Sequence, residues 1–269
     1  MNLALLFEED FVAPDRVRLR GRRLEHLNTV LKAGTGHRIP AGRVNGLRGH
    51  AEVLSMTETE AELLVTLDQQ PPAPLPLTLL LAMPRPKMFR RVLQTCASLG
   101  VKDLWLINSY KVEKSFCQTP WLTEDHLREN LTLGLEQAKD TLMPQVHIRK
   151  LFKPFVEDEL PTLLEGKRAL VAHPGMAAPC PTHLNEPAAL CIGPEGGFTD
   201  YEAGQLADAG CHSVHLGPRI LRVEPAVPVL TTRPFDPCPS TGRLPTVTPP
   251  DARTASARRQ HTDPQQPPR

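Results

Sequence analysis

The chain has 269 residues, of which 40% are hydrophobic, and a formal net charge of +1 at pH 7. This length and apolar content suit two modest globular domains with real cores. No run approaches the roughly 18 apolar residues of a membrane helix, and the start MNLALLFEED lacks the basic n-region of a secretory signal. We therefore expect no membrane partner and a cytoplasmic location.

The cysteines and the charges each restrict the function further. No CxxC pair or zinc-type Cys/His spacing occurs, which predicts reduced thiols and no metal site. The six cysteines are Cys96, Cys117, Cys180, Cys191, Cys211 and Cys238. Between residues 16 and 50, nine basic residues face the single acid Glu25, a segregation that suits either a solvated face or a polyanion such as RNA. They are Arg16, Arg18, Arg20, Arg22, Arg23, Lys32, Arg38, Arg43 and Arg48.

Residues 1–70 are predicted to form a small β-barrel with one helix. Short segments of alternating apolar and polar residues, such as HRIPAG, HAEVLSMT and EAELLVTL, are separated by glycine and proline. The helix candidate is RLEHLNTVLK. Residues 71–76, PPAPLP, cannot sustain regular structure and are predicted to be a linker.

From residue 77 to residue 233, continuous apolar strands alternate with amphipathic helices. The predicted strands are LTLLLAMP, DLWLINS, VHIRKL, RALVAHP, ALCIGP and SVHLG, and the clearest helices are MFRRVLQTCASLG and TEDHLRENLTLGLEQAKD. Thr199 and Glu202 have capping-box spacing and predict the start of another helix. Buried strands interleaved with helices predict an α/β fold with a mainly parallel sheet. The proline-rich residues 234–269 predict a disordered tail.

Three predicted strands end in turns that allow close backbone approach: AHPG, IGPEGGF and LGPRILRVE. Ligands of parallel α/β sheets collect beyond the carboxyl ends of the strands, so the three turns predict one pocket. A phosphate at the glycine turn is disfavoured, because Glu195 within the turn would point a carboxylate at the anion and no Lys-Ser/Thr completes a phosphate-binding loop.

Together these turns resemble the SPOUT class of RNA methyltransferases, and within it the 16S rRNA (uracil-N3) methyltransferase family. The segments LGVKDLWLINSYKVEKSF and LGLEQAKDTLMPQV are similar to that family too, and the resemblance extends to about residue 230. It implies an N-terminal PUA-like β-barrel over residues 1–70 and a SPOUT α/β trefoil-knot domain over residues 77–233. It also implies S-adenosyl-L-methionine as cofactor, a homodimer, and the 16S rRNA of the small ribosomal subunit as partner.

The resemblance also implies the residues of the site. The cofactor contacts fall on three groups, one in each turn: Ala172, His173 and Pro174; Ile192, Gly193, Glu195 and Gly197; and Leu216, Gly217, Ile220 and Leu221. Glu195 either faces the cationic sulfonium or is an acid favoured by a helix N-terminus. Arg222 and Glu224 are the implied catalytic residues: Arg222 for a phosphate or the charge on a uracil oxygen, Glu224 for orienting it or accepting a proton. The alternative is that these two residues pair with each other to brace the turn.

RNA contacts are expected from the basic segment PRPKMFRR, at a helix start where positive charge opposes the dipole, and from the first domain. The residues are Arg85, Lys87, Arg90 and Arg91, with Arg23 and His26 in the first domain. Glu136 and Gln137 match another family segment, with a structural or substrate-loop role.

The chain departs from the family after Glu224, where PAVPVLTTRPFDP replaces an alanine-rich closing helix. Pro225 suits a first helical turn, but the prolines that follow predict a truncated or absent helix, as a shifted reading frame would produce. Three functions therefore stay open: an active methyltransferase, a catalytically impaired remnant that binds RNA through its basic barrel, and a phosphate-binding protein.

Overall fold

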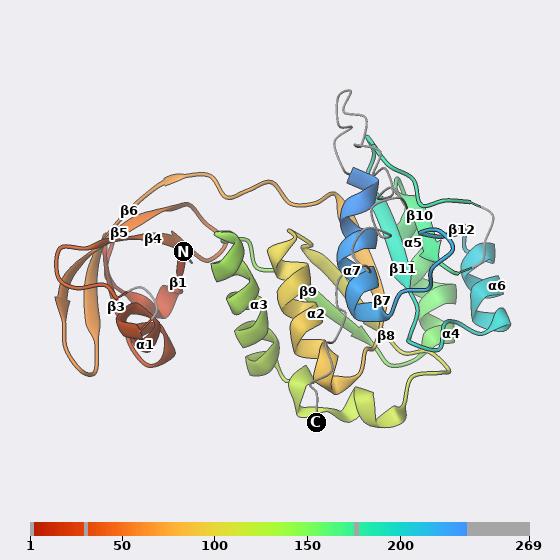
Figure 1. Cartoon of the computed structure of the whole chain (residues 1–269), viewed down its shortest axis with the longest axis horizontal. Coiled ribbons are helices and arrows are strands. Elements are labelled where there is room, and N and C mark those ends of the chain that lie inside the picture. Colours follow the sequence, from red (N-terminus) through yellow and green to blue (C-terminus); the bar gives the residue numbers. More distant parts are fainter. Residues whose placement is uncertain (1–2, 30–31, 175–177, 236–269) are drawn as a thin grey trace, which may run out of the picture. The chain divides into compact units, whose positions relative to one another are not determined.

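The computed structural model describes residues 3–29, 32–174 and 178–235, and their strands form two six-stranded sheets (Figure 1). Most of the predicted tail, residues 236–269, lies outside the described residues. The two tail residues that are described belong to a 3-10 turn, Arg233–Phe235, in which Pro234 is buried. The folded segment therefore extends slightly beyond the boundary predicted at residue 233.

The first sheet contains β1 (Ala4–Leu6), β2 (Phe11–Ala13), β3 (Arg16–Leu19), β4 (Arg38–Arg43), β5 (Arg48–Met56) and β6 (Ala61–Gln69), in the order β1-β4-β5-β6-β3-β2. The neighbours are antiparallel except for the parallel pair β1–β4. The alternation that predicted strands buries Val53 and Leu63 in a core that also holds Leu24 and Leu27 of helix α1 (Arg22–Thr29). Closure into a PUA-like barrel stays a prediction.

Strand β1 contributes side chains to both hydrophobic cores. Ala4 and Leu6 pack in the core of the first sheet, whereas Leu3, Leu5 and Phe7 belong to the core of the second. Successive side chains of a strand point to opposite faces, so one strand can serve two cores. This strand was not predicted from the sequence, because MNLALLF lacks the alternation that indicated the other strands of the first sheet.

The second sheet is parallel throughout, as predicted. It contains β7 (Leu77–Ala82), β8 (Asp103–Ile107), β9 (Gln145–Arg149), β10 (Arg168–Ala172), β11 (Ala188–Ile192) and β12 (His212–Val214), in the order β12-β10-β11-β7-β8-β9. Every residue of β7 and of β11 is buried. A strand covered on both faces needs continuous apolar sequence, which is the pattern that predicted it.

The predicted helices are confirmed as α2 (Pro86–Ser98), α3 (Glu124–Ala138) and α6 (Asp200–Asp208). Gly100, with φ of +84°, follows the C-cap Leu99 of α2, a position where glycine commonly ends a helix. One helical stretch was not predicted: α4 (Phe152–Pro154), a π-helical turn (Phe155–Glu159) and α5 (Leu160–Leu164). Two internal prolines obscure it in the sequence, but buried Phe155 and Leu160 anchor it.

The closing helix, expected to be truncated or absent, is present with ten residues, so the expectation of its absence is wrong. Helix α7 (Val223–Thr232) continues through Pro228 and buries Val227 and Leu230. A proline inside a helix costs roughly 3 kcal/mol, and burial of two large aliphatic side chains offsets a cost of that size. In Figure 1, α7 lies beside α2, against which it packs.

Helices α2 and α3 approach closely at Gly134. A Cβ at this position would lie 2.4 Å from the carbonyl oxygen of Gln94 and 2.7 Å from Cβ of Ala97. We expect Gly134→Ala to lower the free energy of unfolding by about 2 kcal/mol, because overpacking outweighs the better helix propensity of alanine. Gly204→Ala in α6 is the control: its Cβ meets nothing within 4 Å, so stability should rise by about 0.5 kcal/mol. Urea denaturation measures both, and a Gly134→Ala variant as stable as the parent would contradict the packing.

Candidate active site

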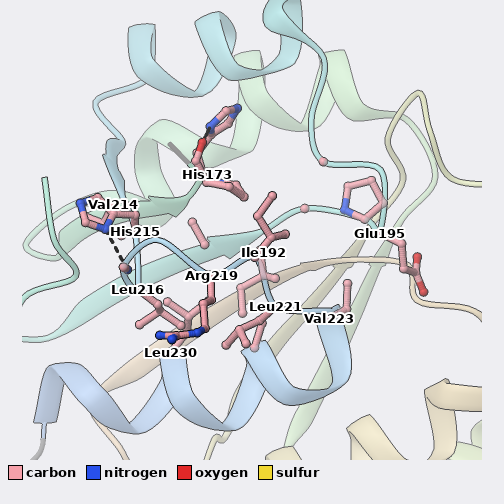
Figure 2. Close-up of a pocket in the computed structure, with 18 residues that line it drawn as sticks. His173, Ile192, Glu195, Val214, His215, Leu216, Arg219, Leu221, Val223 and Leu230 are labelled. Atoms are coloured by element: carbon pink, nitrogen blue, oxygen red, sulfur yellow. Dashed lines mark hydrogen bonds between the residues drawn. The ribbon is translucent and has the colours of Figure 1, made fainter. Parts of the chain in front are cut away.

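The three predicted turns meet at one edge of the second sheet. Strand β10 lies between β11 and β12, and its last residue, Ala172, is in register with both Ile192 and Val214. Because the strands are parallel, their carboxyl ends open onto the same cavity (Figure 2). All eleven residues expected to contact a cofactor line it: Ala172, His173, Pro174, Ile192, Gly193, Glu195, Gly197, Leu216, Gly217, Ile220 and Leu221.

Seven further residues line the cavity that sequence reasoning did not select. They are Pro194, Val214, His215, Arg219, Val223, Ala226 and Leu230. The last three belong to α7, so the helix that was expected to be truncated or absent forms part of the wall. Proximity to the named turns could have identified Pro194, Val214, His215 and Arg219. No local signal identified the α7 residues, because they reach the cavity only through packing of the helix.

The cavity wall is mainly apolar, with a few fixed polar groups. Ile192, Val214 and Leu230 are buried. Nδ1 of His215 accepts a hydrogen bond from the backbone N–H of Gly217 at 2.9 Å, which fixes the third turn where Gly217 has φ of +110° (Figure 2). Apolar walls with few polar groups are typical of small-molecule sites.

Hydrogen bonds to the carboxylate of Glu202 fix the position of the glycine turn. The predicted capping box is confirmed: the Oγ1 of Thr199 accepts from the N–H of Glu202, and the Glu202 carboxylate accepts from the N–H of Thr199 at 2.9 Å. The same buried carboxylate accepts from the backbone N–H of Tyr110 at 2.7 Å. Lys111 donates from Nζ to the carbonyl oxygen of Gly196 at 2.8 Å. The loop after β8 is thereby fixed to the turn that lines the cavity.

Two ion pairs connect α2 to the acids of the second and third turns. Arg85 lies 3.6 Å from Glu195, and Arg91 lies 3.4 Å from Glu224. Glu195 is not an acid of a helix N-terminus, because α6 begins at Asp200 after its N-cap Thr199. The pairing of Glu224 with Arg91 likewise replaces the alternative in which Glu224 and Arg222 brace each other. Arg222 itself is exposed at the start of α7.

The other basic residues of α2 have different surroundings. The Arg90 guanidinium stacks over Trp121 at 4.9 Å, and its Nε donates to Asn130 at 3.4 Å. Lys87 is exposed and makes no ion pair with any residue in the described ranges. RNA contact by these side chains stays a prediction. Of the four basic side chains in PRPKMFRR, three contact other side chains of the protein.

The basic stretch of the first sheet is largely neutralised by acids from elsewhere in the chain. Seven of its nine residues form ion pairs: Arg16 with Glu62, Arg18 and Arg20 with Glu60, Arg22 with Glu136, Arg23 with Asp10, Arg38 with Glu52, and Arg43 with Glu8. Arg48 donates to two backbone carbonyls. The stretch is therefore not the free positive surface that its local sequence suggested.

Two first-domain residues expected to contact RNA are partly enclosed. Arg23 forms its ion pair with Asp10 and lies over the Phe7 ring, 5.3 Å from the centroid. The Nε2 of His26 is buried and has no hydrogen-bond partner among the described residues. Glu136 has the structural role that was one of its two expected alternatives: it is buried, it binds Arg22 through both oxygens, and its carbonyl accepts from the N–H of Leu3.

Burial raises the pKa of each of the five cysteine thiols that the structure describes, which disfavours the nucleophilic thiolate. Burial raises the pKa of the Cys96 thiol to about 12 and that of Cys211 to about 11. The five cysteines in the described part of the chain form no disulfides. Over the same residues, no group of three or more metal-binding side chains is found, and no helix combines the length and apolar character needed to cross a membrane.

Glu202 gives a test of how the glycine turn is held. We expect Glu202→Gln to lower the free energy of unfolding by about 2 kcal/mol, because the amide turns a donor toward N–H groups that need an acceptor. Asp200→Asn removes the same charge from an exposed position of the same helix and should cost about 0.5 kcal/mol. Chemical denaturation of both variants measures the difference, and equal losses would show that only the helix dipole matters.

The chain is similar in sequence and in fold to known proteins. A ribosomal RNA small subunit methyltransferase E from Treponema pallidum (strain Nichols) is 28% identical over 237 residues, covering 84% of this chain and 87% of that protein. The protein of the same name from Synechocystis is 28% identical over 230 residues, covering 78% and 71%. A crystal structure of the Neisseria gonorrhoeae protein of that name, bound to S-adenosyl methionine, has a TM-score of 0.68 at 22% identity, covering 86% and 95%. Residues 71–233, more than half of the chain, match the model of the RNA methyltransferase domain. The chain belongs to this family, as the resemblance of its turns predicted.

Proposed function

We propose that the protein transfers a methyl group from S-adenosyl-L-methionine to N3 of a uridine in the 16S rRNA of the small ribosomal subunit. The observation that carries the proposal is the single cavity lined by all eleven residues of the three turns. Membership of the RNA methyltransferase domain family supports the reaction class, and the shared name of the curated relatives supports the ribosomal substrate.

The residues around the cavity suit this cofactor. Apolar side chains such as Ile192, Leu216 and Leu221 offer a surface for an adenine ring, and the glycine turn leaves backbone groups accessible for ribose and methionine atoms. When bound, S-adenosyl-L-methionine supplies an electrophilic methyl group on a sulfonium. Glu195 is a carboxylate compatible with that positive charge, although its pairing with Arg85 moderates the attraction.

On the substrate side, uracil N3 must lose its proton as it gains the methyl group. Glu224 is the proposed acceptor of that proton, and Arg91 holds its carboxylate 3.4 Å away at the start of α7. Arg222 is proposed to bind a phosphate or the charge that develops on a uracil oxygen. Since N3 lies on the Watson–Crick edge, the target base must be unpaired or extruded from its stack.

The alternative of an impaired RNA-binding remnant is less well supported. It rested on replacement of the closing helix after Glu224 and on RNA binding by the basic barrel, whereas α7 lines the cavity and most of the first-sheet arginines are paired. A phosphate site at the glycine turn is disfavoured by Glu195, which lines the cavity. The trefoil knot, the PUA-like barrel, the linker at residues 71–76, the homodimer and the cytoplasmic location complete the proposal, and family membership supports them.

Cofactor binding can be tested with two apolar positions of similar exposure. Leu221, 39% exposed, lines the cavity, whereas Val229, 41% exposed, lies on α7 outside it. We expect Leu221→Arg to weaken binding of S-adenosyl-L-methionine at least about tenfold, because a guanidinium would repel the sulfonium and occupy space. Val229→Arg should bind as the parent does. Isothermal titration measures both, and a parent chain that is folded but binds no cofactor would overturn the proposal.

The chemical step can be tested at Glu224. We expect Glu224→Gln to lower the rate of methyl transfer to small ribosomal subunits by about a hundredfold, since an amide cannot accept the N3 proton. Glu157→Gln is the control, because Glu157 is also half-exposed and also pairs with a cation, Lys153, at 3.6 Å. Nucleoside mass spectrometry should detect 3-methyluridine with the parent and the control. An unchanged rate in Glu224→Gln would remove Glu224 from the mechanism.

A further inference from the structure

We propose that the RNA strand is held mainly at the rim of the cavity, rather than by the basic stretch of the first sheet. The rim surface consists of Lys87, Tyr110, Lys111, Arg219, Ile220 and Arg222. This inference rests on the proposed function, because it names the surface through which the same site binds its RNA substrate.

The arginines of the first sheet and the cations of the rim differ in how their charges are balanced. Arginines of the first sheet face carboxylates at ion-pair distance, for example Arg16 with Glu62 at 3.1 Å and Arg38 with Glu52 at 3.6 Å. A paired arginine is partly neutralised by its carboxylate and therefore attracts a phosphate less strongly. Glu195, which lines the cavity, and Glu224 of α7 are paired with Arg85 and Arg91, so they do not compensate the rim cations.

The cations of the rim have no such carboxylate. Lys87, Arg219 and Arg222 are exposed and form no ion pair with any residue that the structure describes. Lys111 is exposed and, among the described residues, donates only to a neutral carbonyl. Their positive charges are therefore uncompensated and available to phosphates.

These cations lie in, or close in sequence to, segments that form or contact the cavity wall. Arg219 lines it, and Arg222 lies between two residues that line it, Leu221 and Val223. Lys87 is two residues from Arg85, which contacts Glu195 of the wall. The side chain of Lys111 lies against Gly196, between wall residues Glu195 and Gly197.

Two exposed apolar side chains are interleaved with the cations. Tyr110, 84% exposed, precedes Lys111, and Ile220, 79% exposed, follows Arg219. The backbone of Tyr110 is fixed by its hydrogen bond to Glu202, so its ring is presented from a held position. Cations combined with an exposed aromatic ring are the means by which proteins bind single-stranded RNA, through phosphate contacts and base stacking. An unpaired strand is also what a reaction at uracil N3 requires.

The test uses fluorescence anisotropy of the full chain with a fluorescein-labelled, uridine-containing single-stranded RNA over a series of KCl concentrations. The rim variant Lys87→Gln/Arg219→Gln should bind more weakly, and its slope of log K against log salt should fall in magnitude by about 1.4, or about 0.7 for each phosphate contact. The control Arg16→Gln/Arg38→Gln removes the same net charge from the first sheet and should keep the parent slope. A control that loses as much slope as the rim variant, or more, would overturn the proposal.

Stacking is tested separately at Tyr110. We expect Tyr110→Ala to weaken RNA binding about tenfold with an unchanged salt slope, because stacking releases no counterions, and Tyr110→Phe to bind as the parent does. Equal affinity of the alanine variant would remove Tyr110 from the surface.

Titration of every variant with S-adenosyl-L-methionine separates this inference from the proposed function. A parent chain that binds the cofactor but no RNA overturns the rim surface alone. Rim-dependent RNA binding by a chain that binds no cofactor supports the rim surface and overturns the proposed enzyme.

Discussion

The parallel pairing of β10 with β11 on one side and β12 on the other is the constraint on which the site depends. It sets Ala172 level with both Ile192 and Val214, so three turns that are far apart in the chain begin at the same height and face one space. Antiparallel pairing would send the turns to opposite edges. The remaining features of the site refine this arrangement: Glu202 and Lys111 hold the second turn, and α7 closes the wall.

Helix α7 shows how packing overrides a local helix breaker. Pro225 falls in the first turn, where its missing N–H costs nothing, but Pro228 removes a hydrogen bond from the helix interior. The hydroxyl of Thr231 donates to the carbonyl of Val227, and that of Thr232 donates to the carbonyl of Pro228. Burial of Val227 and Leu230 on the apolar face of the helix offsets the free-energy cost of the lost hydrogen bond. Packing against α2 and β11 therefore stabilises the helix, and the cavity wall depends on that packing.

Charged side chains, too, are paired with residues that lie far away in the chain. Arg22 and Glu136 are 114 positions apart, and Arg16 and Glu62 are 46 apart, yet each pair lies within 3.1 Å. An exposed pair contributes little to stability, roughly 0.2–1 kcal/mol, but it removes a cation from the set available to phosphates. Such pairing decides which arginines of the first sheet keep an uncompensated charge.

The sequence by itself determined the fold class, the strands of the parallel sheet, the capping box at Thr199 and the family, because these depend on apolar periodicity and on turns of fixed spelling. It also named the eleven turn residues, although their common cavity required the sheet. Only the tertiary structure decided that α7 survives Pro228, that Glu195 and Glu224 face arginines of α2, and that most first-sheet arginines are paired. Helix burial and ion pairing join residues distant in the chain, and no local pattern specifies which distant side chain will lie opposite.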